Sequence, residues 1–434
     1  MDNVCAPFAG KRITVLGLGV LGRGAGDAEF LAGCGAQLVV TDKKTEAELA
    51  ESIAKLSKYP NITFHLGRHQ IEDFTNADLV FKAAGVPLDS QEIAAAKKAG
   101  VPVAMSTALF AKSAMDIGAK IVGVTGTRGK STVAHMIFHV LQRAGKRAHL
   151  GGNIRGISTL AMLPNVQGGD MVVLELDSWQ LQGFGDLQIS PHVAVFTNLM
   201  PDHQNYYKDM DEYFTDKANI SLYQKDTDSL FVGPTVADKI GKGSVPPAIP
   251  TDWKLHVVGE HNRENASFAA AALQAVGLSE QEIRSGLESF EPVEGRLQFV
   301  REVHGVKIYN DNNATTPEAT VAALRALEGD VTLIVGGSEK GLALEELVAE
   351  IKQRASNVIL LINPNYKGSA RLAESLQKAG VAYQEAGELP AAVNSALDKT
   401  KAGTILFSPA FASFGMFKNE YERNDQFLAL IRSL

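Results

Sequence analysis

The residues best suited to chemistry form a glycine-rich run near the middle of the chain, residues 125–131 with the sequence TGTRGKS. An apolar strand is expected before it at residues 120–124, and a helix after it at residues 132–144. Glycine lets the backbone turn so that several N–H groups face one anion, and the positive end of the helix adds to the attraction. The closing lysine and serine suit an outer phosphate and Mg²⁺. The run therefore predicts a nucleoside-triphosphate site.

This run is a variant of the usual phosphate loop. Val124 stands five residues before Gly129 where the strict pattern has glycine, and the form Gly-x-Thr-Gly-Thr-x-Gly-Lys-Ser-Thr is present instead. Arg128 adds a second cation next to Lys130. A contact between Arg128 and phosphate and a position facing solvent are both open from the sequence.

A second glycine pattern, Gly17-x-Gly19-x-x-Gly22, follows a short apolar strand expected at residues 13–16. Asp42 stands 20 residues after Gly22, at the end of the next apolar strand. This is the arrangement of a dinucleotide-binding turn with its ribose-binding acid. It predicts a site for a nucleotide diphosphate and does not separate NAD from other nucleotides. A tight turn required only for helix–strand packing is the alternative interpretation.

Two further positions suit a metal ion. Glu175 lies in an apolar strand expected at residues 171–176, where a carboxylate is costly unless it is paired or bound to a metal. A strand expected at residues 193–197 leads into Asp202 and His203. Ligands bind at the carboxyl ends of parallel strands, so we expect Asp202 and His203 in a cleft. His203 is a candidate metal ligand through a neutral imidazole nitrogen, and an exposed loop histidine is the alternative.

Composition excludes several classes of protein. The chain has 434 residues, a net charge of −7, 45% hydrophobic and 21% charged residues, which is typical of a soluble protein with several domains. The acidic balance gives no general attraction for nucleic acid or anionic lipid. No signal peptide is recognisable in residues 1–12, and no apolar run is long enough to span a membrane, so we expect a cytoplasmic protein. Cys5 and Cys34 are then expected to be reduced thiols.

Strand, turn and helix alternate along the whole chain. Three successive α/β units, each with a mainly parallel sheet, are the architecture that this pattern predicts. The second unit begins with the strand before the phosphate loop, and Pro292 and Gly295 interrupt the helical pattern before the third. In the third unit, strands are expected at residues 331–335, 358–362 and 404–407, and a closing helix at residues 424–433.

Seven short segments, spread in order over essentially the whole chain, resemble the Mur ligase family of peptidoglycan synthesis. They are residues 123–132, 151–154, 175–180, 198–203, 259–266, 336–340 and 408–419. The last segment, together with residues 17–22, is most similar to the members that add D-glutamate to UDP-N-acetylmuramoyl-L-alanine.

The resemblance implies three domains and one reaction. Residues 1–117 would form a Rossmann-like UDP-binding domain, residues 118–292 a central P-loop-type ATPase domain, and residues 293–434 a C-terminal Rossmann-like domain that brings the amino acid. ATP would convert the substrate carboxylate to an acyl phosphate, which the amine of D-glutamate attacks with release of phosphate. The family implies ATP and two Mg²⁺ ions, a monomer, and a third domain that moves to bring Arg296 and Lys340 to ATP.

The resemblance also implies site residues. The catalytic set is Lys130, His203, Lys217 and Lys340. ATP would contact Gly126, Thr127, Arg128, Gly129, Lys130, Ser131, Thr132, Asn262, Asn265, Arg296 and Asp311. The UDP substrate would contact Gly19, Val20, Leu21, Asp42, Lys43 and Asn153, and the amino acid Thr315, Lys340, Ser413 and Phe414. The metal set is Ser131, Glu175, His203 and Lys217, with Lys217 as a carbamate. Without the resemblance, Lys217 would be interpreted as an ordinary lysine on a helix surface.

Several positions depart from the family pattern. Arg128 stands where asparagine is frequent, Gly295 where histidine is usual and Gln298 where glutamate is common. Asn312-Asn313 replaces Ser-Lys, and Glu420 stands where an aromatic residue lines the glutamate pocket. A lost lysine and a gained glutamate make a pocket less favourable for a dicarboxylate. The same chemistry with another amino acid, such as L-glutamate, or with another acceptor is therefore an alternative.

Two alternatives belong to other classes of protein. The Gly17 pattern alone is compatible with an NAD-dependent oxidoreductase, but that function leaves the phosphate loop, Glu175 and the third unit unexplained. A nucleotide-gated binding module leaves the metal residues unexplained. Nicotinamide turnover distinguishes the oxidoreductase, and phosphate release that depends on an amino acid distinguishes the ligase.

Overall fold

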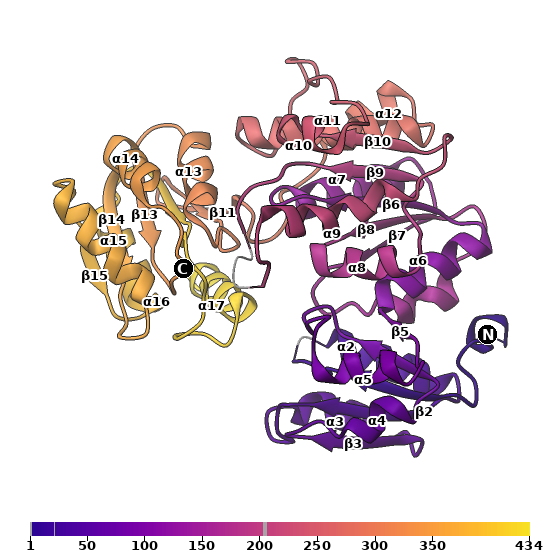
Figure 1. Cartoon of the computed structure of the whole chain (residues 1–434). Coiled ribbons are helices and arrows are strands. Elements are labelled where there is room, and N and C mark those ends of the chain that lie inside the picture. The colour runs from indigo at the N-terminus through magenta and orange to yellow at the C-terminus, as the bar shows by residue number, and fades with distance from the viewer. Residues whose placement is uncertain (1, 21, 203–205) are drawn as a thin grey trace. The chain divides into compact units, whose positions relative to one another are not determined.

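The apolar runs of the sequence form buried strands, and these strands are arranged in three sheets (Figure 1). We describe the protein from a computed structural model, in which residues 2–20, 22–202 and 206–434 are described. Within these residues the sheets are mainly parallel and alternate along the chain with helices, as expected where crossover helices cover both faces. The predicted three-part α/β architecture is confirmed.

The N-terminal sheet has five parallel strands in the order β3-β2-β1-β4-β5. Its strands are β1 (Arg12–Leu16), β2 (Gln37–Asp42), β3 (Ile62–Leu66), β4 (Leu79–Lys82) and β5 (Val103–Ala104). The helices of this part are α1 (Asp2–Cys5), α2 (Arg23–Gly33), α3 (Ala50–Leu56), α4 (Ile71–Thr75) and α5 (Gln91–Lys98). The first glycine turn therefore lies at the carboxyl end of the central strand β1.

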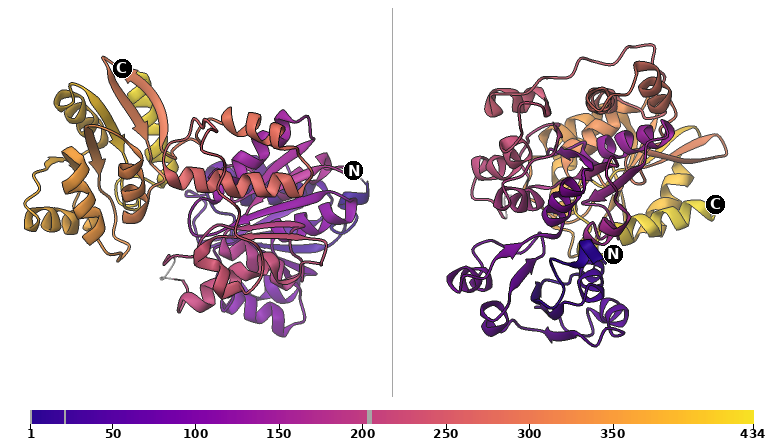
Figure 2. Two further views of the ribbon diagram at one scale, coloured as in Figure 1. Left: turned by 90° about the horizontal axis from the view of Figure 1, so that it is seen from above. Right: turned by 90° about the vertical axis from the view of Figure 1, so that its right-hand side faces the viewer.

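The central sheet also has five parallel strands, in the order β10-β9-β6-β8-β7. They are β6 (Lys120–Thr125), β7 (Ala148–Gly152), β8 (Met171–Glu175), β9 (Val193–Phe196) and β10 (Ser229–Val232). Its helices are α6 (Ser106–Ile117), α7 (Lys130–Arg143), the 3₁₀ helix η1 (Leu160–Asn165), α8 (Ser178–Asp186), α9 (Met210–Leu222), α10 (Pro234–Ile240), α11 (Glu260–Ala275) and α12 (Glu280–Glu288). Figure 2 shows helices on both faces of this sheet. Because β8 and β9 flank β6, their carboxyl ends lie on either side of the phosphate loop.

The third sheet has the order β11-β12-β16-β13-β14-β15 and is parallel except for the pair β11 and β12. Its strands are β11 (Gln298–Val303), β12 (Val306–Asn310), β13 (Val331–Val335), β14 (Ala355–Leu361), β15 (Gln384–Ala386) and β16 (Gly403–Phe407). Its helices are α13 (Pro317–Ala326), α14 (Glu345–Arg354), α15 (Lys367–Lys378), α16 (Leu389–Lys399) and α17 (Glu420–Arg432). Helix α17 begins four residues before the predicted position because the Asn419 side chain accepts hydrogen bonds from the amides of Tyr421 and Glu422.

Contacts divide the chain into two compact units. The first comprises Met1–Pro247 and Ala266–Gly286, and it contains the first two sheets. The second comprises Ala248–Asn265 and Leu287–Leu434, and it contains the third sheet. Each unit is described by itself below. The boundaries at residues 117/118 and 292/293 stay predictions.

The two cysteines are joined, which corrects the expectation of free thiols. Cys5 on α1 and Cys34 at the end of α2 form a disulfide, with their Cα atoms 4.9 Å apart. Their separation of 29 residues in the sequence concealed this proximity, since only the packing of α1 brings Cys5 to α2.

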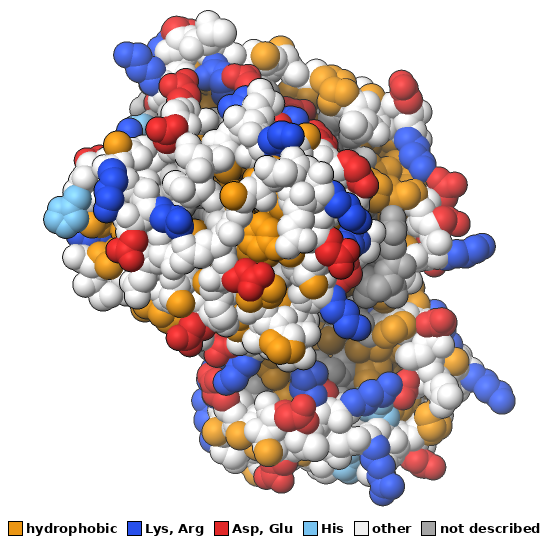
Figure 3. Space-filling model, turned by 90° about the vertical axis from the view of Figure 1, so that its left-hand side faces the viewer, with side chains coloured by type: hydrophobic (Ala, Val, Ile, Leu, Met, Phe, Trp, Pro, Cys, Tyr) orange, Lys and Arg blue, Asp and Glu red, His pale blue; other side chains and the backbone are white. Residues whose placement is uncertain are grey.

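The surface carries both basic and acidic side chains, as the amino-acid composition leads one to expect. Figure 3 shows one face of the molecule, on which basic and acidic side chains are interspersed. None of the helices in the described ranges combines the length and the apolar character that crossing a membrane requires.

Candidate active site

The phosphate loop connects β6 to α7 in the backbone conformation that its glycines allow. Gly126 has φ 143°, and Gly129 has φ 83° at the N-cap of α7. A Cβ atom on Gly126 would lie 2.0 Å from the Thr197 hydroxyl oxygen, which is far inside van der Waals contact. Only glycine fits at position 126, so the loop can approach the end of β9 closely.

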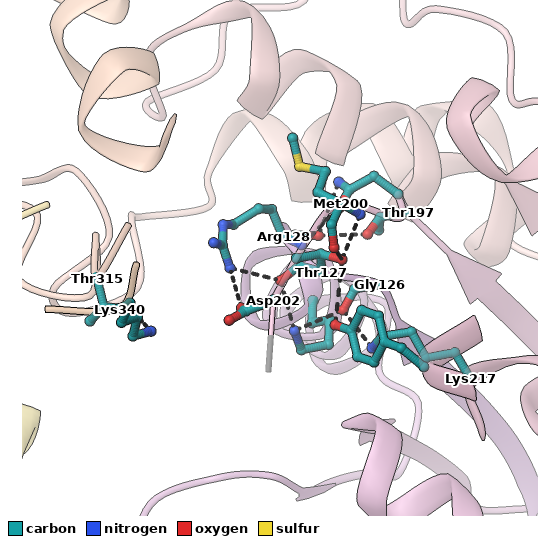
Figure 4. A network of polar contacts seen from close by, with 12 residues as sticks. Gly126, Thr127, Arg128, Thr197, Met200, Asp202, Lys217, Thr315 and Lys340 are labelled. Carbon is teal, nitrogen blue, oxygen red and sulfur yellow. Dashed lines mark hydrogen bonds and ion pairs between the residues drawn. The ribbon is translucent and has the colours of Figure 1, made fainter. Parts of the chain in front are cut away.

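The segment after β9 holds the loop in place (Figure 4). The Thr127 amide donates to the Asn198 carbonyl oxygen at 2.9 Å, and the Arg128 amide donates to the Asn198 side-chain oxygen at 2.8 Å. The Thr127 hydroxyl donates to the Met200 carbonyl at 3.2 Å and accepts from the Met200 amide at 3.0 Å. These bonds orient the loop before any nucleotide binds.

Two lysine amines meet at one carbonyl oxygen of the loop. Lys130 Nζ and Lys217 Nζ each donate to the Gly126 carbonyl at 2.9 Å, and Lys217 Nζ also donates to the Thr125 hydroxyl at 3.3 Å. Lys217 is on α9 and only 1% exposed, with its amine 4.8 Å from the centre of the Tyr213 ring. Burial, followed by repulsion from Lys130, lowers the pKa of Lys217 well below the usual value for lysine. Lys217 is therefore buried against the phosphate loop and is not an ordinary surface lysine.

Arg128 forms an ion pair, which neither of its two sequence interpretations included. Its guanidinium lies 3.1 Å from the Asp202 carboxylate and also donates to the Thr127 carbonyl at 3.3 Å. Asp202 thus reaches the phosphate loop, in agreement with the expected position at the end of β9. His203 lies outside the described residues.

Ser131 and Glu175 fit a Mg²⁺ ion. Ser131 is buried in the first turn of α7, and Glu175 is 3% exposed at the end of β8, opposite Val124 of β6. In the described part of the chain, no hydrogen bond or ion pair reaches the Glu175 carboxylate, whose burial is costly without a cation. No three His, Cys, Asp or Glu side chains of the described residues form a metal cluster. A site here would therefore depend on the Ser131 hydroxyl, Glu175 and a modified Lys217.

Most of the residues predicted for the UDP substrate surround one cavity in the first unit. It has a volume of about 580 Å³ and is lined by Gly19, Val20, Asp42 and Lys43. Asn153 adjoins the lining residue Gly152, and Leu21 lies outside the described residues. The predicted nucleotide-diphosphate site and the residues after β7 thus lie on the same cavity.

Sequence reasoning missed Lys82, which also lines this cavity. It is 2% exposed at the end of β4, and its amine donates to the carbonyl oxygens of Ala83, Ala84 and Val86 at 3.2, 3.1 and 2.6 Å. Burial lowers the pKa of Lys82 to about 8. Lys82 shapes the cavity wall through this backbone loop, and the available signal was a lysine that ends an apolar strand.

Two residues predicted to contact ATP meet at the start of the third sheet. Asp311 is buried and accepts hydrogen bonds from the Leu297 amide at 3.0 Å and the Ser408 hydroxyl at 2.8 Å. Burial raises the pKa of Asp311 to about 7, and the nearby charge of Arg296 partly opposes this shift. Arg296 and Asp311 are therefore neighbours, as expected. On α11, the Asn265 side chain donates to the Asn262 side chain at 3.1 Å.

The residues predicted for the amino acid lie in the second unit. Lys340 Nζ donates to the Thr315 hydroxyl at 3.3 Å (Figure 4). Ser413 is 1% exposed, with its hydroxyl oxygen buried and without a hydrogen-bond partner in the described residues, whereas the adjacent Phe414 is 59% exposed. A buried hydroxyl without a partner is costly, so Ser413 suits a polar ligand.

The structure gives roles to two of the departures from the family pattern. Arg423 is fully buried, and its guanidinium donates to the side-chain and main-chain oxygens of Asn312 at 2.8 and 2.9 Å. Asn312 therefore accepts two hydrogen bonds from the buried Arg423 guanidinium. Burial lowers the pKa of Arg423 to about 10, and the negative charge of Glu420 partly opposes this shift. The negative charge of Glu420 therefore acts on the buried Arg423 guanidinium.

Models of three domains match the chain. They are the MurD-like N-terminal domain of Mur ligases at residues 11–105, the Mur ligase middle domain at residues 124–242 and the glutamate ligase domain of Mur ligases at residues 295–411. These matches follow the order of the three sheets.

Curated relatives match over nearly their whole length. A UDP-N-acetylmuramoylalanine–D-glutamate ligase from Roseiflexus sp. is 33% identical and covers 98% of this chain and 99% of the relative. One with the same name from Clostridium botulinum is 34% identical, with 98% of this chain and 97% of the relative covered.

The α/β architecture with a phosphate loop defines a nucleotide-binding enzyme. The chain belongs to the Mur ligase family.

Solved structures show the same fold at lower identity. UDP-N-acetylmuramate–alanine ligase MurC from Thermotoga maritima has a TM-score of 0.63 at 19% identity, with 98% of this chain and 99% of that chain covered. MurF ligase from the same organism, solved in complex with ADP, has a TM-score of 0.61 at 15% identity, with 99% and 96% covered.

A methyl group at position 126 tests the loop geometry. We expect Gly126→Ala to weaken ATP binding at least tenfold, a loss of roughly 1.4 kcal/mol or more, because the added Cβ displaces the loop from Thr197. The measurement is ATP affinity by calorimetry. The control is Gly33→Ala, because a Cβ on Gly33 meets no atom within 4 Å. Wild-type affinity in Gly126→Ala would contradict the close packing described here.

The raised pKa of Asp311 predicts how stability depends on pH. The folded protein retains a proton at this carboxyl up to a pKa of about 7, whereas the unfolded chain loses it near the usual aspartate pKa of 3.8. Between these values the unfolded chain binds fewer protons, so the free energy of unfolding falls as pH rises.

Asp311→Asn should remove this loss, which is on the order of 2–4 kcal/mol across the interval. The measurement is urea unfolding at several pH values between 4 and 8. Asp398→Asn, an exposed site on α16, is the control and should keep the wild-type slope. An unchanged slope in Asp311→Asn would show that this carboxyl is not protonated in the folded protein.

Proposed function

We propose that this protein is an ATP-dependent ligase that joins D-glutamate to UDP-N-acetylmuramoyl-L-alanine through an acyl phosphate. The observation that carries the proposal is the meeting of Lys130 and Lys217 at the Gly126 carbonyl. A phosphate loop explains Lys130, and a further reaction component would explain the buried amine of lowered pKa beside it. Two relatives that match over nearly their full length, at 33% and 34% identity, are UDP-N-acetylmuramoylalanine–D-glutamate ligases, which supports D-glutamate as the amino acid.

The two lysines would take different parts in the reaction. Lys130 would bind the outer phosphates of ATP and offset the charge that develops on the transferred phosphoryl group. Lys217 would react as a neutral amine with CO₂, forming an N–C bond and releasing one proton. This carbamylation replaces a cation with an anion, and a depressed pKa favours it because only the neutral amine is nucleophilic.

Ser131, Glu175 and the carbamate of Lys217 would hold Mg²⁺, with His203 as the further ligand that the family resemblance implies. When bound, Mg²⁺ supplies charge neutralisation for the phosphoryl group. Lys340 and Thr315 would bind a carboxylate of glutamate, and the buried Ser413 hydroxyl would contact the same substrate. Arg296 and Asp311 would bind ATP at its phosphate and ribose.

Carbamylation of Lys217 has a chemical test. We expect Lys217→Ala to lose activity at least a hundredfold and to regain part of it with formate or acetate, because a small carboxylate can replace the missing anion. The measurement is steady-state phosphate release with and without these acids. Lys225→Ala, an exposed site beyond α9, should behave as wild type in both conditions. Normal activity of Lys217→Ala without additive would rule out the carbamate.

The overall reaction is tested by phosphate release from ATP with Mg²⁺, UDP-N-acetylmuramoyl-L-alanine and a panel of amino acids that includes both enantiomers of glutamate. We expect the strongest response with D-glutamate, and no turnover in Lys130→Ala. Absence of phosphate with every amino acid would overturn the ligase. A stronger response to another amino acid would overturn only the choice of D-glutamate, and nicotinamide turnover would favour the oxidoreductase.

A further inference from the structure

The glycine turn after β1 has part of its anion-binding capacity occupied by the protein itself. The amides of Leu18 and Gly19 both donate to one oxygen of the Asp42 carboxylate, at 2.9 and 3.1 Å. The other oxygen accepts from the Lys44 amide at 2.9 Å. In a dinucleotide-binding turn such amides face a pyrophosphate. Here these two amides are already bonded, so a side-chain donor would add to the anion-binding capacity that remains in this cavity.

Arg23 is the side chain best placed to be that donor. It is the first residue of α2, directly after Gly22 at φ 81°, and it lines the cavity with its side chain half-buried. Its guanidinium donates to the Asn153 side-chain oxygen at 2.7 Å. This bond connects the N-terminal sheet to a residue that the family resemblance assigns to the substrate. A guanidinium has further donors beyond the one that this bond uses.

The position of Arg23 is fixed by the packing of α2. One turn further along the helix, Asp27 accepts a hydrogen bond from the Ser158 hydroxyl at 2.6 Å. A Cβ atom on Gly26 would lie 2.6 Å from the Cβ atom of Ser158, so α2 and this segment are in close contact. Residues four apart share one face of a helix, which directs Arg23 and Asp27 to the same segment.

Burial raises the pKa of Asp27 to about 6, and the nearby charge of Arg23 partly opposes this shift. Among the residues that the structure describes, no salt bridge joins the two side chains, and Asp27 forms its short hydrogen bond with Ser158. Lys43 and Lys44 also line the cavity near Asp42. Arg23 is therefore a cation at the start of a helix, where the helix dipole favours the same anion.

We propose that Arg23 binds the diphosphate of the UDP-linked substrate and, together with Asn153, sets the preference of this cavity for a nucleoside diphosphate over a nucleoside. This inference rests on the proposed function, and it assigns the diphosphate to a side chain instead of to the amides of the Gly17–Gly19 turn. A guanidinium can contact two phosphate oxygens at once, which suits a diphosphate.

The test compares UDP with uridine, because the two ligands share the base and ribose and differ in the diphosphate. Calorimetry on the full-length protein should show that Arg23→Gln weakens UDP binding roughly tenfold or more and leaves uridine binding unchanged. Arg23→Lys should regain part of the loss, since it restores the charge without the planar group. The KM for ATP should stay at the wild-type value.

Arg12→Gln is the matched control. Arg12 begins β1, at the opposite end of that strand from the glycine turn, and its exposed side chain pairs with Asp78 at 3.4 Å. This variant removes the same charge from the same sheet and should bind UDP as wild type does.

Three results would overturn the proposal. They are wild-type affinity for UDP in Arg23→Gln, an equal loss for UDP and uridine, and an equal loss of UDP binding in Arg12→Gln. Wild-type protein that binds UDP through Arg23 but forms no amide product would overturn the proposed function and leave this role intact. Wild-type protein that binds neither UDP nor uridine would overturn both.

Discussion

The hydrogen bond from the buried Lys217 amine to the Gly126 carbonyl is the interaction on which the central site depends. An ammonium group in the interior is costly, and its hydrogen-bond partners here are neutral oxygens. Lys130 donates to the same carbonyl, and its charge adds to the effect of burial in lowering the pKa of Lys217 well below the usual value for lysine. The arrangement therefore favours the neutral form of the Lys217 amine. The charge of Lys130 would attract a phosphate group at this place.

Much of the fold was predictable because buried parallel strands leave a simple pattern. The strands β6, β8 and β13 are short, nearly continuous apolar runs, and each occurs where the sequence indicated it. The antiparallel pair β11 and β12 was missed because β11 is only partly buried and carries charged residues. Such a strand lacks the apolar run of a buried one. The Cys5–Cys34 disulfide was missed for a different reason, since it depends on packing between separate elements.

The site was predictable only where chemistry is local. Gly126, Lys130 and Ser131 are adjacent in the sequence, and their types and order are enough to indicate a phosphate loop. Lys217 lies 91 residues from Gly126 and is surrounded by ordinary helical sequence, so only the resemblance to a family pointed to it. The pairing of Arg128 with Asp202, 74 residues away, required the order of β6 and β9 in the sheet. The fold topology decides which distant residues surround a side chain, and these neighbours in turn decide its pKa.

The pairing of Asp42 with the first glycine turn has a consequence for competition in a cell. An open nest of amides would attract small anions such as inorganic phosphate, which lack the remainder of a nucleotide. An internal carboxylate that accepts two of these amides reduces the number of donors available to such anions. A large ligand loses less, because it contacts many other residues of the cavity. Asp42 thus occupies two amides that a small anion would otherwise find open.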